Sequence, residues 1–477
     1  MTDHEVLRML RARTVGQSVA AACCVLALGG CSRGTSASLS FPDAPVIIID
    51  IDTLRADHLG CYGYERPTSP NIDEWSREAI RFEWAFAQGP NTPPSQSSIL
   101  TGLYPSIHGR LRKEQLLRND VLTLAELMSE QGYATAAFVD GGNMSATFGM
   151  GQGFDLYDDA GGGVEAFGAK AADWLRDHSE GRFLLLLHTF DVHSPYDVSP
   201  EPFNSAFRDE VELPSQSFRS NMSEYMHARR VSRNTKTPFR LTPVEVDYAR
   251  AFYDGGILHV DDWFGRLWRV LRGLGLDERA IVVVISDHGD EFEEHDSVFH
   301  ERIYATITHV PLLIRLPGGV AARSVGEAVE TIDMLPTLLD LTDVAVPRFL
   351  HGRSLVPFLT GDDTWVESAM SESRFYGGRL AVADHTFRLV FSRRDGMMEL
   401  YRYREDPLEQ HDLFSAHGSE ARRLLDTLKR WEFTVTAGAT SAPTVDQIDD
   451  RTFQQLEALG YVEHAAEGAP AVPSDDE

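Results

Sequence analysis

Four residues of this chain have the types and the surroundings of a divalent-metal site. Asp52 follows an apolar run in APVIIIDIDTLRAD, and Asp287 and His288 follow another in AIVVVISDHGDE. Thr92 lies in a separate stretch, GPNTPPSQSSILTGLYP. Two carboxylates, a hydroxyl and an imidazole suit one divalent cation. Because only one ligand is a nitrogen, the set leaves zinc, manganese and calcium open.

Thr92 is the candidate nucleophile. Pro93 and Pro94 favour entry to a helix, Ser95 suits its cap and Gly102 suits its end, so Thr92 is predicted just before a helix N-terminus. Free amides and the helix dipole favour an anion at such a point. A threonine hydroxyl ionises poorly in water, but a bound cation stabilises its alkoxide and makes it a nucleophile. The alternative is that Thr92 and Ser95 are only capping residues.

Strands that alternate with helices must bring these residues together. Apolar runs at Val46–Ile49, Arg182–Asp191 and Ala280–Glu291 indicate buried strands. Helical spacing of apolar residues predicts helices between them, at Asn71–Ala79, Leu122–Gln131, Ala166–Arg176 and Pro243–Leu274. This alternation predicts an α/β fold with a mainly parallel sheet and helices on both faces. The ligand site of such a sheet lies outside the carboxyl ends of its strands.

The composition changes along the chain and predicts its domains. The polar segment Ser199–Arg240 is interpreted as an insertion on the substrate side, and short alternating runs after Pro347 predict a small antiparallel sheet followed by a helix at Ser419–Trp431. We therefore expect five parts: a lipoprotein signal peptide (1–30), a tether (31–43), a catalytic domain (44–346), an α+β subdomain (347–435), and a linker, closing helix and disordered tail (436–477).

The N-terminus predicts export and anchoring. Arg8, Arg11 and Arg13 precede VAAACCVLALGG, an apolar run too short to be a permanent membrane span. It ends at Cys31 in a pattern that resembles the bacterial lipobox, in which this cysteine is lipidated. Ser32 in place of Asp favours the outer membrane in that resemblance. The predicted location is thus the cell envelope, at a membrane surface, and the alternative is an ordinary signal peptide with a chance cysteine.

Charge and cysteine content exclude two classes of function. A net charge of −28 argues against a nucleic-acid partner, which would need a basic face. With Cys23 and Cys24 in the signal peptide and Cys31 lipidated, only Cys61 remains, so the mature chain has neither an internal disulfide nor a cysteine-based zinc site.

Together the motifs resemble the sulfatase family of the alkaline phosphatase superfamily. The segments that carry the resemblance are IDTLRADHLGCYGYERPTSPNIDEWSREAIRF, NTPPSQSSILTGLYPSIHG, LAELMSEQGYATAAF, SDHGDEFEEH, VPLLIRLPG and ELYRYREDPLEQHDLF. They extend from about Val46 to Phe414, and LEALGYVE is a further familiar ending. The resemblance implies the fold of that superfamily, with a small C-terminal antiparallel subdomain. It also implies ester hydrolysis and metal ligation by Asp52, Asp287 and His288.

The resemblance assigns roles to further residues. His193 falls where the family has a histidine near the leaving group, and His300 falls where many members have a lysine that touches the ester anion. We expect Gln96, Arg55 and His108 on the substrate side. For Arg55 the alternative is that it holds loops by ion pairs, and for His108 the alternative is a structural role in a tight turn.

The active-site stretch departs from the family pattern. Sulfatases have Cys or Ser, any residue, Pro, Ser and Arg, and the Cys or Ser is oxidised to formylglycine. Here Thr92 takes the nucleophile position and Gln96 replaces the arginine. Asp140 and Gly142 stand where sulfatases have Lys and His, and Thr53 replaces the second of two adjacent aspartates.

These departures favour phosphoester chemistry. The second hydroxyl of a formylglycine hydrate expels sulfate by elimination, and threonine has none. Thr92 therefore fits a two-step phosphoryl transfer, as in phosphodiesterase and phosphotransferase relatives such as nucleotide pyrophosphatases and lipoteichoic acid synthases. The expected substrate is a small-molecule, lipid or envelope-polymer ester. The alternatives are a sulfatase proper and a catalytically inactive binding protein that kept the fold.

Overall fold

The computed structural model describes residues 39–232, 238–361, 368–373, 378–439, 441–445, 448–459 and 461. One compact unit begins at Leu39. The predicted signal peptide, Cys31 and most of the predicted tether lie outside the described residues and stay predictions. Among the described residues, none of the helices combines the length and the apolar content that a membrane crossing needs.

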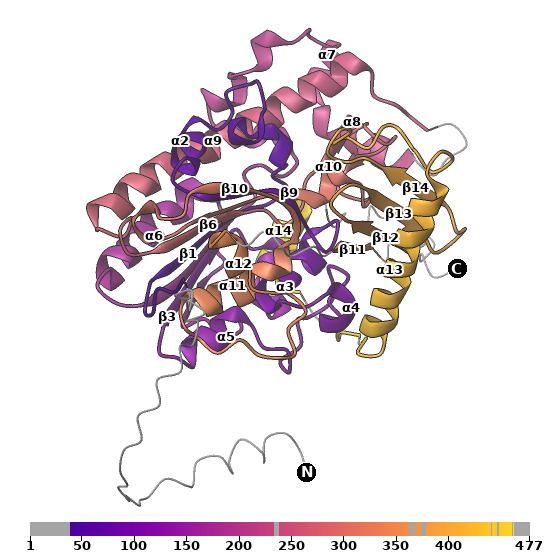
Figure 1. Ribbon diagram of the computed structural model, residues 1–477. Coiled ribbons are helices and arrows are strands. Elements are labelled where there is room, and N and C mark those ends of the chain that lie inside the picture. The colour runs from indigo at the N-terminus through magenta and orange to yellow at the C-terminus, as the bar shows by residue number, and fades with distance from the viewer. Residues whose placement is uncertain are drawn as a thin grey trace, which may run out of the picture. The chain divides into compact units, whose positions relative to one another are not determined.

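An eight-stranded sheet forms the centre of this unit, in the order β10-β2-β9-β6-β1-β5-β3-β4 (Figure 1). β9 runs antiparallel to both of its neighbours, β2 and β6, and the other pairs are parallel. The predicted mainly parallel sheet is therefore confirmed. The strands are β1 (Val46–Ile51), β2 (Ile80–Phe86), β3 (Ala134–Val139), β4 (Leu156–Asp158), β5 (Phe183–Thr189), β6 (Ile281–Ile285), β9 (His309–Arg315) and β10 (Arg323–Glu330).

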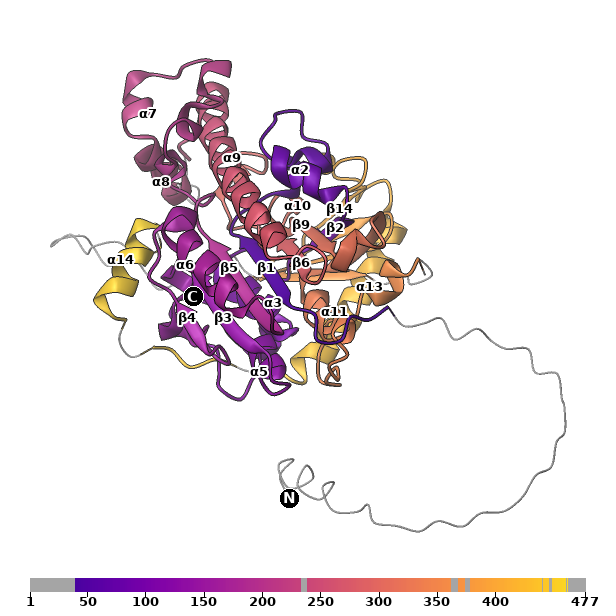
Figure 2. The same cartoon turned by 90° about the vertical axis from the view of Figure 1, so that its left-hand side faces the viewer.

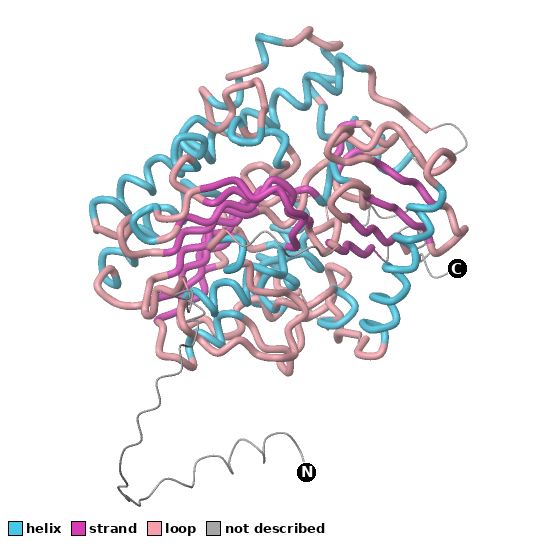
Figure 3. The backbone as a smooth tube through the Cα atoms, viewed as in Figure 1, coloured by secondary structure: helices cyan, strands magenta, loops and turns pink. Residues whose placement is uncertain are grey.

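Helices cover both faces of the sheet (Figure 3). Alternate residues of β1 point to opposite faces, so Val46 and Ile48 pack in one core and Ile47 and Ile49 in the other. The first core includes residues of α3 (Thr92–Thr101), α5 (Leu124–Ser129) and α11 (Met334–Leu341). The second includes residues of α2 (Pro70–Ser76), α6 (Gly163–His178) and α9 (Pro243–Gly273), whose length crosses that face (Figure 2). The predicted helices are confirmed, with ends shifted by a few residues.

Shorter elements connect these layers. The remaining short α-helices are α4 (Pro105–His108), α7 (Gln216–Ser220), α8 (Met222–Ser232), α10 (Ala305–Thr308) and α12 (Val356–Leu359). The 3-10 turns are η1 (Ala56–His58), η2 (Gly60–Tyr62), η3 (Gly142–Met144), η4 (Ala146–Phe148), η5 (Tyr196–Val198), η6 (Phe203–Ser205), η7 (Arg208–Glu210), η8 (Pro317–Gly319) and η9 (Thr331–Asp333). The segment predicted to be an irregular insertion contains α7 and α8, and it buries Phe218, Met222 and Met226 in the second core.

A second sheet confirms the predicted C-terminal subdomain. β11 (Ala369–Ser373), β12 (Arg379–Ala383), β13 (Arg388–Ser392) and β14 (Met398–Tyr401) form a four-stranded antiparallel sheet, and α13 (Gly418–Thr436) packs on it. Because α12 packs in the first core of the large sheet, the small sheet begins later than the predicted boundary at 347. The last helix, α14 (Asp450–Ala458), returns to the large sheet and packs on η3. β7 (Glu291–Phe292) and β8 (Val298–Phe299) form a short hairpin.

Candidate active site

The carboxyl ends of two neighbouring strands bring three of the predicted ligands together. Asp52 directly follows β1, and Asp287 and His288 follow β6, which pairs with β1 in parallel. One ligand atom from each of the three side chains lies within 4.8 Å of the others, and all three residues are buried. The backbone N–H of Thr53 donates to Asp287 Oδ1 at 3.3 Å and fixes that carboxylate beside the end of β1.

The charges of this cluster fit a divalent cation. Asp52 Oδ1 and Asp287 Oδ2 are buried without a hydrogen-bond partner. Burial, Asp287 and Asp50 together raise the pKa of Asp52 well above its usual range. Buried like charges that lack hydrogen bonds are costly unless a cation neutralises them. The oxygen and imidazole donors are of the kind that hard and borderline divalent ions accept.

Thr92 lies beside this cluster. Its Oγ1 is 3.2 Å from Asp52 Oδ2 and 3.3 Å from His288 Nε2. Thr92 is the first residue of α3, and Asn91 is the N-cap. The predicted capping role of Ser95 is wrong, because its hydroxyl donates to Gly89 O at 2.8 Å. Gly102 ends the helix as predicted, in the left-handed region at φ 65°. The structure thus places the predicted nucleophile and the predicted ligands in one site.

His193 and His300 face the same point from two loops. Nε2 of His193 lies 3.1 Å, and Nε2 of His300 3.3 Å, from the hydroxyl of Tyr461, which is itself 3.1 Å from Thr92 Oγ1. Their other nitrogens are held by Ser194 O at 2.5 Å and by Asp290 Oδ1 at 2.7 Å. Burial lowers the pKa of His193 to about 3 and that of His300 well below its ordinary value, so both imidazoles are neutral here.

Gln96 is buried on α3, about one helical turn after Thr92. Its side-chain amide atoms are buried without a hydrogen-bond partner, and so are both oxygens of the Asp50 carboxylate. Burial and Asp287 raise the pKa of Asp50, and the nearby amide of Gln96 opposes this in part. Gln96 is thus a neutral amide near the Asp50 carboxylate, at the position where the family pattern has an arginine.

Arg55 and His108 lie outside the point where the other side chains converge. Arg55 is 2% exposed and donates to Asp57, to Asp290 O at 2.9 Å and to Glu294 at 2.7 Å, so it holds the loop after β6, the alternative stated for it. His108 Nε2 lies 3.2 Å from Ser98 Oγ, and the Arg110 N–H donates to its Nδ1 at 3.1 Å. Burial lowers the pKa of His108 to about 3. The structure shows neither residue in contact with Thr92.

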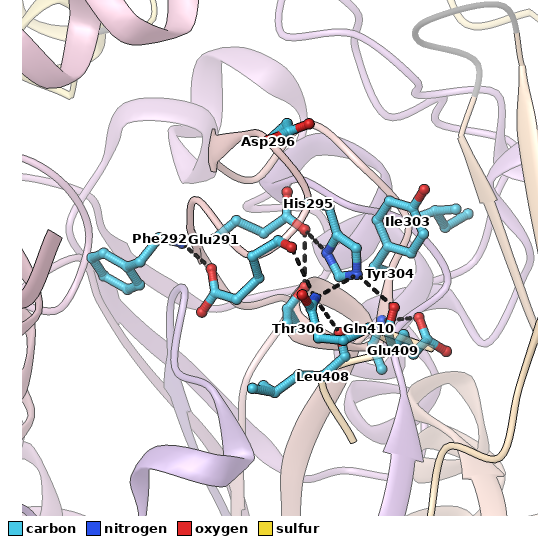
Figure 4. Close-up of polar contacts among 12 residues, drawn as sticks. Glu291, Phe292, His295, Asp296, Ile303, Tyr304, Thr306, Leu408, Glu409 and Gln410 are labelled. Carbon is cyan, nitrogen blue, oxygen red and sulfur yellow. Dashed lines mark hydrogen bonds and ion pairs between the residues drawn. The ribbon is translucent and has the colours of Figure 1, made fainter. Parts of the chain in front are cut away.

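The C-terminal subdomain contacts the loop around His295, as Figure 4 shows. The same loop carries His300. His295 contacts Glu291 Oε1 at 2.5 Å and Glu409 O at 3.2 Å. Thr306 Oγ1 donates to the same oxygen of Glu291 at 3.0 Å. Glu409 in turn accepts from Arg388 at 2.9 Å, and both of these side chains are buried. The small sheet therefore holds one wall of the site in place.

Four residues of the site were not singled out from the sequence: Asp50, His188, Asp290 and Tyr461. His188 lies in β5, one residue before its end, and its Nε2 is 3.6 Å from Asp52 Oδ2. A charged residue inside the apolar run VIIIDI was a readable signal for Asp50. Asp290 lies three residues after Asp287 in the same motif. For Tyr461, separated by 369 residues from Thr92, local sequence holds no such signal.

Comparisons with known proteins identify the family of the chain. The sulfatase family profile matches residues 45–344, and the profile of the C-terminal part of N-sulphoglucosamine sulphohydrolase matches residues 293–431. Arylsulfatase K of Bos taurus is 26% identical over 67% of this chain and 66% of its own length. N-acetylglucosamine-6-O-sulfatase of Bacteroides thetaiotaomicron is 22% identical over 85% of this chain and 88% of its own.

Solved structures show the same fold. Phosphonate monoester hydrolase SpPMH from Silicibacter pomeroyi superposes with a TM-score of 0.67 at 21% identity, covering 82% of this chain and 96% of its own. The structure of BT4656 in complex with its substrate D-glucosamine-2-N,6-O-disulfate superposes with a TM-score of 0.68 at 19% identity. The match covers 83% of this chain and 98% of the BT4656 chain. With the family profile matched over more than half of its length, the chain belongs to the sulfatase family of ester hydrolases.

Proposed function

We propose that the protein hydrolyses phosphoesters with Thr92 as its nucleophile. Asp52, Thr92, Asp287 and His288 would hold one divalent cation, which when bound supplies a Lewis acid and stabilises the Thr92 alkoxide. The observation that carries the proposal is the position of Thr92 Oγ1, 3.2 Å from Asp52 Oδ2 and 3.3 Å from His288 Nε2, at the N-terminus of α3.

The residues around Thr92 support a two-step displacement. Thr92 Oγ1 forms a bond to phosphorus while the bond from phosphorus to the leaving alcohol breaks. His193 Nε2, neutral in this structure, accepts the Thr92 proton and passes it to the leaving oxygen. Water then attacks phosphorus and the bond to Thr92 Oγ1 breaks. A proton of the water returns to Thr92, and the product is phosphate from a monoester or a phosphomonoester from a diester. His300 is neutral in this structure, but a bound anion at its Nε2, together with the Asp290 carboxylate at its Nδ1, would favour the protonated imidazole.

The N-terminal motif supports a place for this reaction. Lipidation at Cys31 would hold the protein at a membrane surface of the cell envelope, facing lipid or polymer esters as well as small molecules. We propose this location and this substrate range together. Detection of a diacylglycerol-modified Cys31 in the native protein by mass spectrometry would support the anchor, and an unmodified, freely released mature chain would contradict it.

The test is a comparison of ester classes on the purified protein after chelation and reloading with zinc, manganese or calcium. Aryl phosphomonoesters, phosphodiesters, phosphonate monoesters and sulfate esters are assayed side by side. Thr92→Ala is expected to lose at least about 10³-fold in turnover, whereas Thr92→Ser keeps a nucleophile and part of the rate. Mass spectrometry of a rapidly quenched reaction should find phosphate on the peptide that contains Thr92.

A sulfatase proper is the second candidate, favoured by the sulfatases among the relatives. Faster turnover of sulfate esters than of every phosphoester, without any phosphothreonine, would establish it in place of the first proposal. A non-catalytic binding protein is the third candidate, favoured by Gln96, which lacks the positive charge of the family's arginine. For this candidate Thr92→Ala would leave the biological activity intact, while removal of the metal would not.

A further inference from the structure

The last described part of the chain lies across the candidate active site. We call residues 441–445, 448–459 and 461 the closing segment. Its first half pairs with the loop before α5: Leu116 N–H donates to Pro443 O at 2.8 Å, and Val445 N–H donates to Glu114 O at 2.9 Å. Asp449 then accepts from Thr147 Oγ1 at 2.8 Å at the start of α14. This path leads the chain into α14, which contacts η3.

α14 docks on a glycine-rich turn that has space for it. Gln455 Oε1 accepts from Gly142 N at 3.0 Å, and its amide donates to Asp159 O at 3.1 Å. A Cβ added at Gly142 would lie 2.9 Å from a methyl carbon of Leu459, and one at Gly141 would lie 2.2 Å from Gln455 Oε1. The histidine that the family pattern places at position 142 would therefore exclude the closing segment. α14 can dock here because residue 142 is a glycine and has no side chain.

Tyr461 ends this path among the reactive groups. Its hydroxyl lies 3.1 Å from Thr92 Oγ1, 3.1 Å from His193 Nε2 and 3.3 Å from His300 Nε2. These are the nucleophile and the two imidazoles that would contact an anionic ester. The Tyr461 hydroxyl oxygen contacts all three groups at once. We infer that it lies where an oxygen of a bound ester would lie. Lys113 Nζ also donates to the carbonyl oxygen of Tyr461, and the ring of His193 packs against the ring of Tyr461.

The site is closed in this arrangement. Thr92, Asp52, Asp287 and His288 are all 0% exposed. Because a substrate oxygen and the Tyr461 hydroxyl cannot occupy the same position, an ester reaches Thr92 only after Tyr461 leaves. We propose that the closing segment is an intramolecular gate: Tyr461 competes with the anionic ester for Thr92, His193 and His300, and α14 undocks when the ester binds. The gate rests on the proposed function, since it requires these three residues to be the anion site.

Two variants of the full-length protein test the gate at different points. Tyr461→Ala removes the competing hydroxyl, and Gln455→Ala weakens the docking of α14 without contacting the site. Tyr403→Phe is the matched control, because it removes a buried tyrosine hydroxyl whose bond, to Asp384 O at 2.6 Å, lies in the C-terminal subdomain. The probe is inorganic phosphate, titrated calorimetrically into the metal-loaded protein, together with the Michaelis constant for the best ester.

Loss of the internal competitor is expected to tighten phosphate binding and to lower KM about tenfold in Tyr461→Ala, the equivalent of about 1.4 kcal/mol, and severalfold in Gln455→Ala. Tyr403→Phe should match the wild type. Hydrogen exchange of the amides of residues 450–459 in the wild type should become faster when phosphate is bound.

Any of four results would overturn the gate. Unchanged phosphate affinity in both variants, or slower exchange of α14 with phosphate bound, would show that Tyr461 stays in the site; the proposed function would stand. A fall in turnover without a change in KM would make Tyr461 a positioning residue instead. Absence of both phosphate binding and ester hydrolysis in every variant would remove the anion site itself, and with it the proposed function.

Discussion

The carboxylate of Asp290 contacts His300 Nδ1 at 2.7 Å, and the other oxygen of the same carboxylate accepts from Tyr196 OH at 2.7 Å. Tyr196 thus fixes the carboxylate, and the carboxylate fixes the imidazole. This leaves His300 Nε2 directed to the point where Thr92 and His193 also converge. A positive charge on His300 would be stabilised by Asp290 behind it.

Asp290→Asn is expected to reduce kcat/KM by about 10²-fold, because the amide neither fixes the imidazole tautomer nor stabilises an imidazolium. The variant should also shift the pH dependence of kcat/KM, a change that a purely structural role would not produce. Tyr196→Phe keeps the contact between Asp290 and His300, so its kcat/KM should fall much less than that of Asp290→Asn. Equal losses in the two variants, with no shift of the pH profile, would argue against an orienting role for Asp290.

Removal of the metal is expected to destabilise the fold as well as abolish activity. Asp52 and Asp287 each have a buried oxygen without a hydrogen-bond partner, which a cation would neutralise. A cation that binds only the folded state, at a free concentration of 100 times its Kd, raises the free energy of unfolding by about 2.7 kcal/mol. Thermal unfolding with and without added cation measures this. In Asp52→Asn the added cation should raise the melting temperature little, whereas the control Asp426→Asn, at an exposed position of α13, should respond like the wild type.

The buried pair of Arg388 and Glu409 should contribute strongly to stability. Arg388 also donates to Ile303 O at 2.6 Å, and Glu409 accepts from Ala305 N at 2.8 Å. Arg388→Met leaves a buried carboxylate without its cation and is expected to lower the free energy of unfolding by about 3–5 kcal/mol in urea titrations. Arg176→Met, at an exposed pair with Asp173, should cost less than about 1 kcal/mol. A similar cost at both sites would show that the buried pair is replaceable.

Much of the fold and the metal-ligand cluster with Thr92 could be predicted from the sequence. The β-branched run at Val46–Ile49 fits only a strand covered on both faces, and its carboxyl end placed Asp52 beside Asp287 without knowledge of any contact. Arg55 was open between two roles because its partners, Asp57 and Glu294, meet it only in the folded chain. Local sequence likewise did not predict Tyr461.

Because several histidines are buried, we expect the free energy of unfolding to fall in mild acid. His108 is suited to test this because it lies outside the candidate metal site. Its pKa is about 3 in the folded protein, whereas an unfolded histidine titrates near 6.5. The unfolded state therefore binds more protons below about pH 6.5, so the stabilising contribution is present above that pH and is lost as pH falls toward 3.

His108→Gln should accordingly flatten the pH dependence of unfolding. Each proton contributes about 1.4 kcal/mol per pH unit, so the difference between pH 6.5 and pH 5 should shrink by about 2 kcal/mol in the variant. Urea titrations at the two pH values measure this difference. His411→Gln, at a side chain that is 83% exposed, provides the control. An unchanged slope in His108→Gln would mean that His108 is protonated in the folded protein.

Asp52 and Tyr461 are attached to parts of the fold that differ greatly in local stability. Asp52 follows β1, which is hydrogen-bonded on both edges in the middle of the large sheet, whereas Tyr461 stands beyond a short terminal helix. Local opening requires less free energy than global unfolding. Dilute urea is therefore expected to raise turnover of a dilute ester before higher urea abolishes it, and a rate that only falls would contradict this. The enzyme would then work fastest slightly outside the conditions in which it is most stable.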